Sequence, residues 1–140
     1  MNSNIRFKEF LPESCPPATA TPPEPEKVIR LVSHQGSLTE KDFASYAAIN
    51  EQGKPNNLCP CRWASCSVFS GPEKIHAARA VARLPKFRKR NLRYAAYLEL
   101  NNDSGVYERS PNGSAHCDLW MYEHFNPIAN TNDPIEDLLK

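Results

Sequence analysis

The sequence lacks long apolar segments. No stretch of its 140 residues approaches the roughly 20 apolar residues that a membrane-spanning helix needs, so we expect no membrane partner. The first residues also lack the apolar stretch of a secretory signal peptide. Both absences favour a cytoplasmic protein, in which thiols stay reduced and clustered cysteines more often bind metal, react or pack than form disulfides. The odd cysteine total of five also fits a disulfide framework poorly.

The sequence also lacks an excess of charge of one sign. Seventeen lysines and arginines face sixteen acidic residues, so an argument for an anionic partner must rest on local clustering. The common catalytic and nucleotide-binding motifs are missing too: there is no P-loop, Rossmann fingerprint, Ser-His-Asp motif or H-E-x-x-H. The length and the 40% hydrophobic content predict one domain with a modest core.

Proline is abundant near the N-terminus. Residues 1–27 contain "LPESCPPATATPPEPEK", which cannot form ladder hydrogen bonds and favours extended polyproline conformation. This block is predicted to be a Pro-rich tail or tether that lies outside the core or wraps it. Residues 28–140 are predicted to form a single α+β domain.

Hydrophobic periodicity and turn residues predict the elements of that domain. We expect strands at 27–33, 61–70 and 114–122, a hairpin formed by 94–100 and 106–110, and a short C-terminal helix at 132–140. Two main helices are expected at 36–50, where Ser37 and Glu40 have capping-box spacing, and at 71–84, with Ser70 as N-cap. The predicted fold is a small twisted antiparallel or mixed sheet with two main helices and a Pro-rich N-terminal extension.

The cysteines form a cluster with two interpretations. Cys59, Cys61 and Cys66 read C-x-C-x4-C, tighter than the usual C-x2-4-C pairs of zinc sites. A fourth ligand would have to come from Cys117, His116 or His76. Packing of the thiols in a core is the favoured interpretation, and a zinc site with Cys59, Cys61, Cys66 and Cys117 is the alternative. No other cofactor is indicated.

A run of basic residues follows the second predicted helix. Such a cluster suits neutralisation of phosphates, and Phe87 could add stacking. The alternative is a solvated connection between helix and strand that happens to be charged. The candidate nucleic-acid or anion-binding residues are Arg79, Arg83, Lys86, Arg88, Lys89, Arg90 and Arg93.

Polar residues inside predicted strands indicate a ligand pocket. Arg30 lies in a strand that is otherwise apolar on both faces, so its guanidinium needs a carboxylate, a phosphate or solvent. His116, Asp118 and Trp120 alternate on one strand face, which suits a proton carrier, a charge and a stacking platform. An exposed polar face with Trp120 at the rim of the core is an equal alternative. The pocket hypothesis takes Arg30, Ser67 and Trp120 as ligand-binding residues, with His116 and Glu123 as catalytic candidates.

The pattern "RLVS…DFASY…C…CSVF…HCDLW" resembles a family of small bacterial proteins with no established activity, over about residues 28–125. The matching positions are Arg30, Asp42, Phe43, Ser45, Cys61, Ser67, Val68, Phe69, His116 and Trp120, with Cys66 where that family has leucine. A weaker similarity is to ADP-ribosyltransferase and RES-type toxin folds, which would give Arg30 and Ser67 a dinucleotide-binding role. Those folds also use a late glutamate, for which only Glu108 or Glu123 is available here.

Two functions therefore remain open. One is a pocket for a nucleotide-like or phosphorylated ligand, as in a toxin-type or defence-type transferase. The other is a noncatalytic module that binds nucleic acid or an acidic protein partner through residues 86–93. The sequence does not decide whether the protein is an enzyme.

Overall fold

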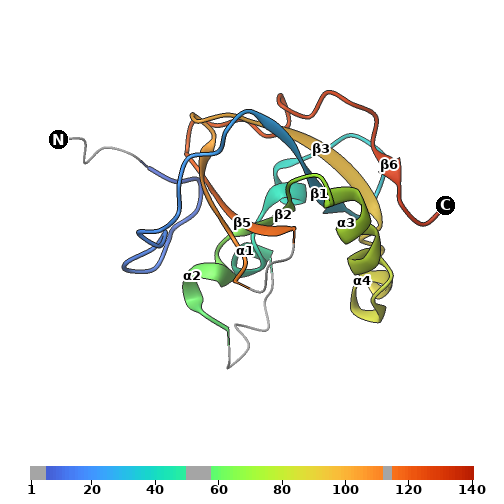
Figure 1. The fold of residues 1–140 in the computed structure, drawn as a ribbon, viewed down its shortest axis with the longest axis horizontal. Coiled ribbons are helices and arrows are strands. Elements are labelled where there is room, and N and C mark those ends of the chain that lie inside the picture. The colour runs from blue at the N-terminus through green and yellow to red at the C-terminus, as the bar shows by residue number, and fades with distance from the viewer. Residues whose placement is uncertain (1–5, 50–57, 112–114) are drawn as a thin grey trace.

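The structure is a computed structural model, and it describes residues 6–49, 58–111 and 115–140. These residues form an α+β fold around a six-stranded sheet in which every neighbouring pair is antiparallel, with the order β4-β5-β2-β1-β3-β6 (Figure 1). The strands are β1 (Glu26–Val32), β2 (Cys66–Phe69), β3 (Tyr94–Leu100), β4 (Gly105–Arg109), β5 (His116–Met121) and β6 (Glu136–Asp137). The α+β class is confirmed, and the sheet is antiparallel rather than mixed.

The helices of the described residues are short. They are the 3-10 helix η1 (Glu40–Phe43), α1 (Tyr46–Ile49), α2 (Pro60–Trp63), α3 (Lys74–Ala82) and α4 (Pro85–Lys89). None of them is both long and apolar enough to cross a membrane. The expectation of two main helices is not confirmed, because only α3 exceeds five residues.

The predicted helix at 36–50 is divided into η1 and α1. Its cap lies two residues later than expected, at Thr39, since the Asp42 carboxylate accepts the backbone N–H of Thr39 at 2.8 Å. Ala44 is extended, and the carbonyls of Asp42 and Ala44 accept hydrogen bonds from Arg30. A continuing helix would have used these carbonyls itself, so the arginine contact replaces the helical ladder.

Two further boundaries differ from the expectation for similar local reasons. Pro60 occupies the first turn of α2, so residues 60–63 are helical where an extended segment was expected. Ser70 does not cap α3, because its hydroxyl donates to the Glu26 carboxylate at 2.8 Å and the helix begins later, at Lys74.

The predicted hairpin of 94–100 and 106–110 is wrong, although both strands exist. β3 pairs with β1 along all seven residues, and β4 pairs with β5. The backbone of Gly105 lies so close to β5 that a Cβ would overlap the carbonyl oxygen of Trp120, which only glycine permits. The predicted C-terminal helix is also wrong, because Glu136–Asp137 pairs with β3 as β6.

The sheet is buried on both faces because its strands alternate between two apolar clusters. One face holds Val28, Val68, Leu98, Cys117 and Leu119, and is closed by Phe43 and Phe125. The other holds Ile29, Leu31, Phe69 and Ala95, covered by Ala78 and Ala82 of α3 and by Leu138. Phe87 of α4 and Leu92 pack against this second cluster, so α3 and α4 lie on that face.

The Pro-rich segment contacts the domain along the part that the structure describes. Phe7 and Thr21 form isolated bridges with Tyr122 and Tyr107, and the second bridge lies on the outer edge of β4. Cys15 forms a disulfide with Cys61, which contradicts the expectation of reduced thiols. Figure 1 shows this segment in blue, on the opposite side of the molecule from α3 and α4.

We expect this disulfide to contribute about 2–4 kcal/mol to the free energy of unfolding, because it closes a loop with a sequence separation of 46. Urea unfolding should show this loss in the Cys15→Ser/Cys61→Ser variant and in the unaltered protein with a reductant. The exposed thiol of Cys59 supplies the control, and Cys59→Ser should leave the unfolding midpoint unchanged. Equal midpoints with and without reductant would contradict the assignment.

Candidate functional site

The Arg30 guanidinium is hydrogen-bonded within the fold. It donates to three backbone carbonyls, those of Asp42 at 2.9 Å, Ala44 at 2.9 Å and Ser67 at 3.1 Å. These bonds connect β1 to η1 and to the start of β2. The guanidinium that the sequence predicts as a ligand-binding group therefore stabilises the contacts of β1 with η1 and β2.

Arg30 and His116 lie on opposite faces of the sheet. Ile29 pairs with Phe69, and Phe69 pairs with His116, so these three side chains share a face. Arg30 follows Ile29 in the same strand and points to the other face. The Ser67 side chain shares the His116 face, because Ser67 pairs with Asp118. The structure therefore does not bring Arg30 and His116 to a common pocket.

Trp120 is enclosed by the protein. Its side chain is 2% exposed, and its indole N–H donates to the Cys61 carbonyl at 3.0 Å. The hollow beside it, lined by Phe7 and Leu119 among others, has a volume of only about 10 Å³. A nucleotide ring cannot stack on Trp120 in this arrangement.

Glu123 is not placed beside His116. It is exposed and follows β5, while His116 begins that strand, and the six residues of β5 alone span about 20 Å. Its backbone N–H donates to the Arg6 carbonyl at 2.8 Å. The two catalytic candidates therefore do not form a pair.

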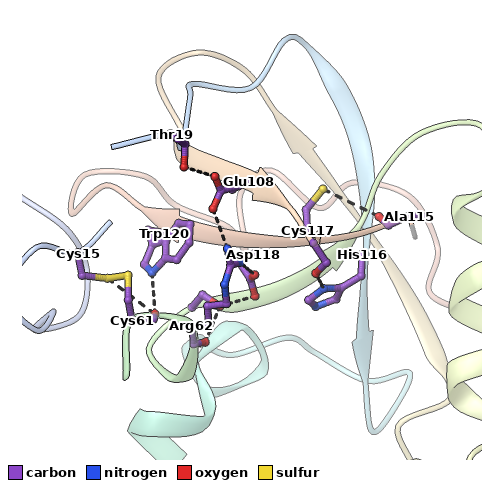
Figure 2. Close-up of polar contacts among 12 residues, drawn as sticks. Cys15, Thr19, Cys61, Arg62, Glu108, Ala115, His116, Cys117, Asp118 and Trp120 are labelled. Carbon is purple, nitrogen blue, oxygen red and sulfur yellow. Dashed lines mark hydrogen bonds and ion pairs between the residues drawn. A yellow bond between two sulfur atoms is a disulfide. The ribbon is translucent and has the colours of Figure 1, made fainter. Parts of the chain in front are cut away.

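Sequence reasoning missed a partly buried charge cluster under β5. The Arg62 guanidinium contacts the Asp118 carboxylate and donates to Glu108 at 2.8 Å, and the Ser65 hydroxyl donates to Asp118 at 2.9 Å (Figure 2). Asp118 is 4% exposed, and Glu108 is its register partner on β4. The one signal in the sequence that could have indicated this cluster is Asp118, an aspartate in a largely apolar strand. Its partner Arg62 lies 56 residues earlier in the chain.

His116 borders this cluster. Figure 2 shows its ring on the same side of β5 as Asp118 and Trp120, with Cys117 on the other side. The Nδ1 atom of the ring lies 2.5 Å from the Ser110 hydroxyl, and the ring meets Phe69 edge-on. Burial lowers the pKa of His116 below its usual value, and nearby Asp118 partly opposes this shift. The native fold thus favours the neutral ring.

The four candidate metal ligands are separated. Cys61 is oxidised, Cys59 is exposed, and Cys66 and Cys117 are buried in the first apolar cluster, where burial raises the pKa of both thiols. In the described ranges, no three His, Cys, Asp or Glu side chains are placed to hold a metal ion. Packing accounts for Cys66 and Cys117.

The basic residues form an exposed surface on α4 and the end of α3. We call the exposed side chains of Arg83, Lys86, Arg88, Lys89 and Arg90 the basic surface. Phe87 is half-buried and packs against the second apolar cluster, so its ring contributes to packing rather than standing free for the stacking expected from the sequence. The cationic side chains around it are exposed.

A groove beside the basic surface extends it toward the C-terminal residues. Arg79, Arg83, Arg88 and Lys140 line it, together with Glu136 and Asp137, and its volume is about 720 Å³. Both acids are engaged elsewhere: Asp137 accepts two bonds from Arg93 at 2.8 and 3.0 Å, and Glu136 accepts the Tyr97 hydroxyl at 2.5 Å. The bonds from Arg93 lower the pKa of Asp137. Burial, the larger cause, and the hydrogen bond to Glu136 together raise the pKa of Tyr97 to about 12.

Arg93 and Arg79 differ from the other basic candidates. Arg93 is paired with Asp137, and the Arg79 Nε donates to the Leu138 carbonyl at 3.1 Å. Both are half-buried: Arg79 fixes the C-terminal residues to α3, and Arg93 fixes them to the start of β3. Of the seven predicted anion-binding residues, the five of the basic surface are therefore the exposed ones.

No family model matches the chain, and neither the curated proteins nor the solved structures contain a significant match. The resemblances drawn from the sequence thus stay predictions, and the functional argument rests on geometry and charge.

We expect the Arg30→Met variant to lose about 2–4 kcal/mol of unfolding free energy, because three carbonyls lose a charged donor. Chemical denaturation measures this loss. The control is Arg83→Met, which removes an exposed guanidinium and should cost under about 0.5 kcal/mol. Equal stabilities of the two variants would contradict a structural role for Arg30.

The lowered pKa of His116 predicts a dependence of stability on pH. Below about pH 6.5 the unfolded chain protonates this histidine while the native state keeps it neutral, so stability falls as the pH is lowered. Between pH 7.5 and 5.5 the loss from this residue is at most about 1.4 kcal/mol.

Urea unfolding at these two pH values should show a smaller loss for His116→Gln than for the unaltered protein. The exposed His76 gives the matched variant, and His76→Gln should follow the unaltered protein. A His116→Gln curve with the full pH dependence would show that the ring titrates normally.

Proposed function

We propose that the protein binds nucleic acid through phosphate contacts made by the basic surface. The observation that carries the proposal is the absence of partners there: among the described residues, Arg83, Lys86, Arg88 and Lys89 have no carboxylate within ion-pair distance. The Arg90 guanidinium lies over the ring of Tyr46.

Several other cationic side chains of the fold already have ion-pair or hydrogen-bond partners. Arg62 is held by Glu108 and Asp118, Arg93 by Asp137, and Arg30 by three carbonyls. The net charge is only +1, but the charged groups are unevenly distributed. Much of the interior charge is paired, whereas in the described ranges the cations of the basic surface are not. Solvent-exposed unpaired cations release counterions when they meet a phosphate backbone, which drives association.

The residue types favour phosphate over carboxylate partners. Three of the five side chains are arginines, whose planar fork matches phosphate oxygens. Three arginines, Arg79, Arg83 and Arg88, also line the adjoining groove, whose volume is about 720 Å³. A small-ligand transferase has weaker support, because Arg30 and His116 do not share a recess. Binding without catalysis is thus the function that this geometry supports best.

The test is the affinity for a fluorescent 20-nucleotide oligonucleotide at about 50 and 200 mM salt. Lys86→Glu/Lys89→Glu should weaken binding tenfold or more and reduce the slope of log affinity against log salt by about 2. Arg6→Glu/Lys41→Glu makes the same charge change at exposed positions outside the basic surface and should have a much smaller effect.

Equal losses for the two variants would show that net charge, not this surface, governs binding. The second measurement is the affinity for polyglutamate at the same salt concentration. If polyglutamate binds as tightly as the oligonucleotide, the partner is an acidic protein and the nucleic-acid proposal fails.

A further inference from the structure

The topology brings three helices to one end of the sheet. β1 ends at Val32, and because β2 and β3 run antiparallel to it, both begin at the same end. The segment with α1 follows β1, α2 precedes β2, and α4 precedes β3. Figure 1 shows α1 and α2 close together, with α4 farther along the molecule. Arg90, which follows α4, reaches Tyr46 of α1.

An aromatic pair occupies this meeting point. The rings of Tyr46 in α1 and Trp63 in α2 are stacked, with centroids 5.9 Å apart and planes 17° from parallel. The guanidinium carbon of Arg90 lies 5.4 Å from the Tyr46 ring centroid. Arg90 thus links the basic surface to the aromatic pair.

Neither ring belongs to the core. Tyr46 and Trp63 are half-buried and join neither apolar cluster. By contrast, Trp120 is 2% exposed, and the half-buried Phe87 packs against the second cluster. Partly exposed flat rings next to unpaired cations combine the two elements by which proteins hold single-stranded nucleic acid. Cations follow the backbone, and aromatic faces receive unpaired bases at about 1–3 kcal/mol per base.

We propose that Tyr46 and Trp63 form a base-stacking platform, so that the protein prefers single-stranded to double-stranded nucleic acid. This inference rests on the proposed function, since the backbone contacts come from the basic surface. A duplex keeps its bases stacked on each other, and therefore offers phosphates to the basic surface but no base to the platform.

Tryptophan fluorescence tests the platform directly, because the chain has two tryptophans and only one is accessible. Trp120 is 2% exposed and bonded to a carbonyl, so quenching by an added ligand reports on Trp63. The three ligands are oligo-dT, a duplex of the same length and inorganic polyphosphate, which carries the charge without bases. Oligo-dT should quench the emission, and the duplex and polyphosphate should not.

Substitution gives the second measurement. Trp63→Leu should weaken oligo-dT binding by about 5- to 150-fold, which corresponds to one stacked base, and leave polyphosphate binding unchanged. Trp63→Phe should fall between. Tyr122→Leu removes a half-buried ring that stacks on His124, away from the basic surface, and serves as the matched control. If Trp63→Leu does not fold, the quench in the unaltered protein decides.

The outcomes separate the two proposals. Binding of all three ligands with equal affinity and no quench would overturn the platform and leave phosphate binding intact. If none of the three ligands binds, the proposed function itself is overturned. Quenching by polyphosphate would show that Trp63 responds to charge alone, which also overturns the platform.

Discussion

Burial of both faces of β1 is the constraint on which the structure depends. Val28 and Ile29 are adjacent and point to opposite sides, yet both are fully buried. One strand thus serves two apolar layers, and each layer needs its own cover: η1 and Phe125 on one face, α3 and α4 on the other. The positions of η1, α3 and α4 follow from this requirement rather than from their own propensity.

Polar groups inside the sheet had to be paired for the same reason. Arg30 sits in β1, between two apolar layers, and donates to backbone carbonyls, while Asp118 in β5 is paired with Arg62 and Ser65. Leaving either group without partners would cost several kcal/mol. The consequence for function is that the polar residues most conspicuous in the sequence are used for structure, and the exposed, unpaired charge is left on α4.

Local sequence signals predicted much of the fold but not its connections. The strands at 94–100 and around 116–121 were predicted from alternation, and α3 was expected near its observed position. The pairing of β3 with β1, instead of with β4, was not visible, because the turn after Leu100 has the residues of a hairpin whichever strand becomes the neighbour. The basic residues were found from their clustering, but which of them are free depended on Asp137 and Leu138, about 50 residues later.

The sequence by itself determined the class of the fold, the positions of most strands and the presence of a basic cluster, because hydrophobic period and local charge are properties of neighbouring residues. Only the tertiary structure decided that Arg30 and His116 face apart, that Cys15 meets Cys61, and that Tyr46 and Trp63 stack beside Arg90. These relations join residues distant in the chain, and they are set by strand order and register. A shift of one position along a strand would reverse the face of every side chain in it.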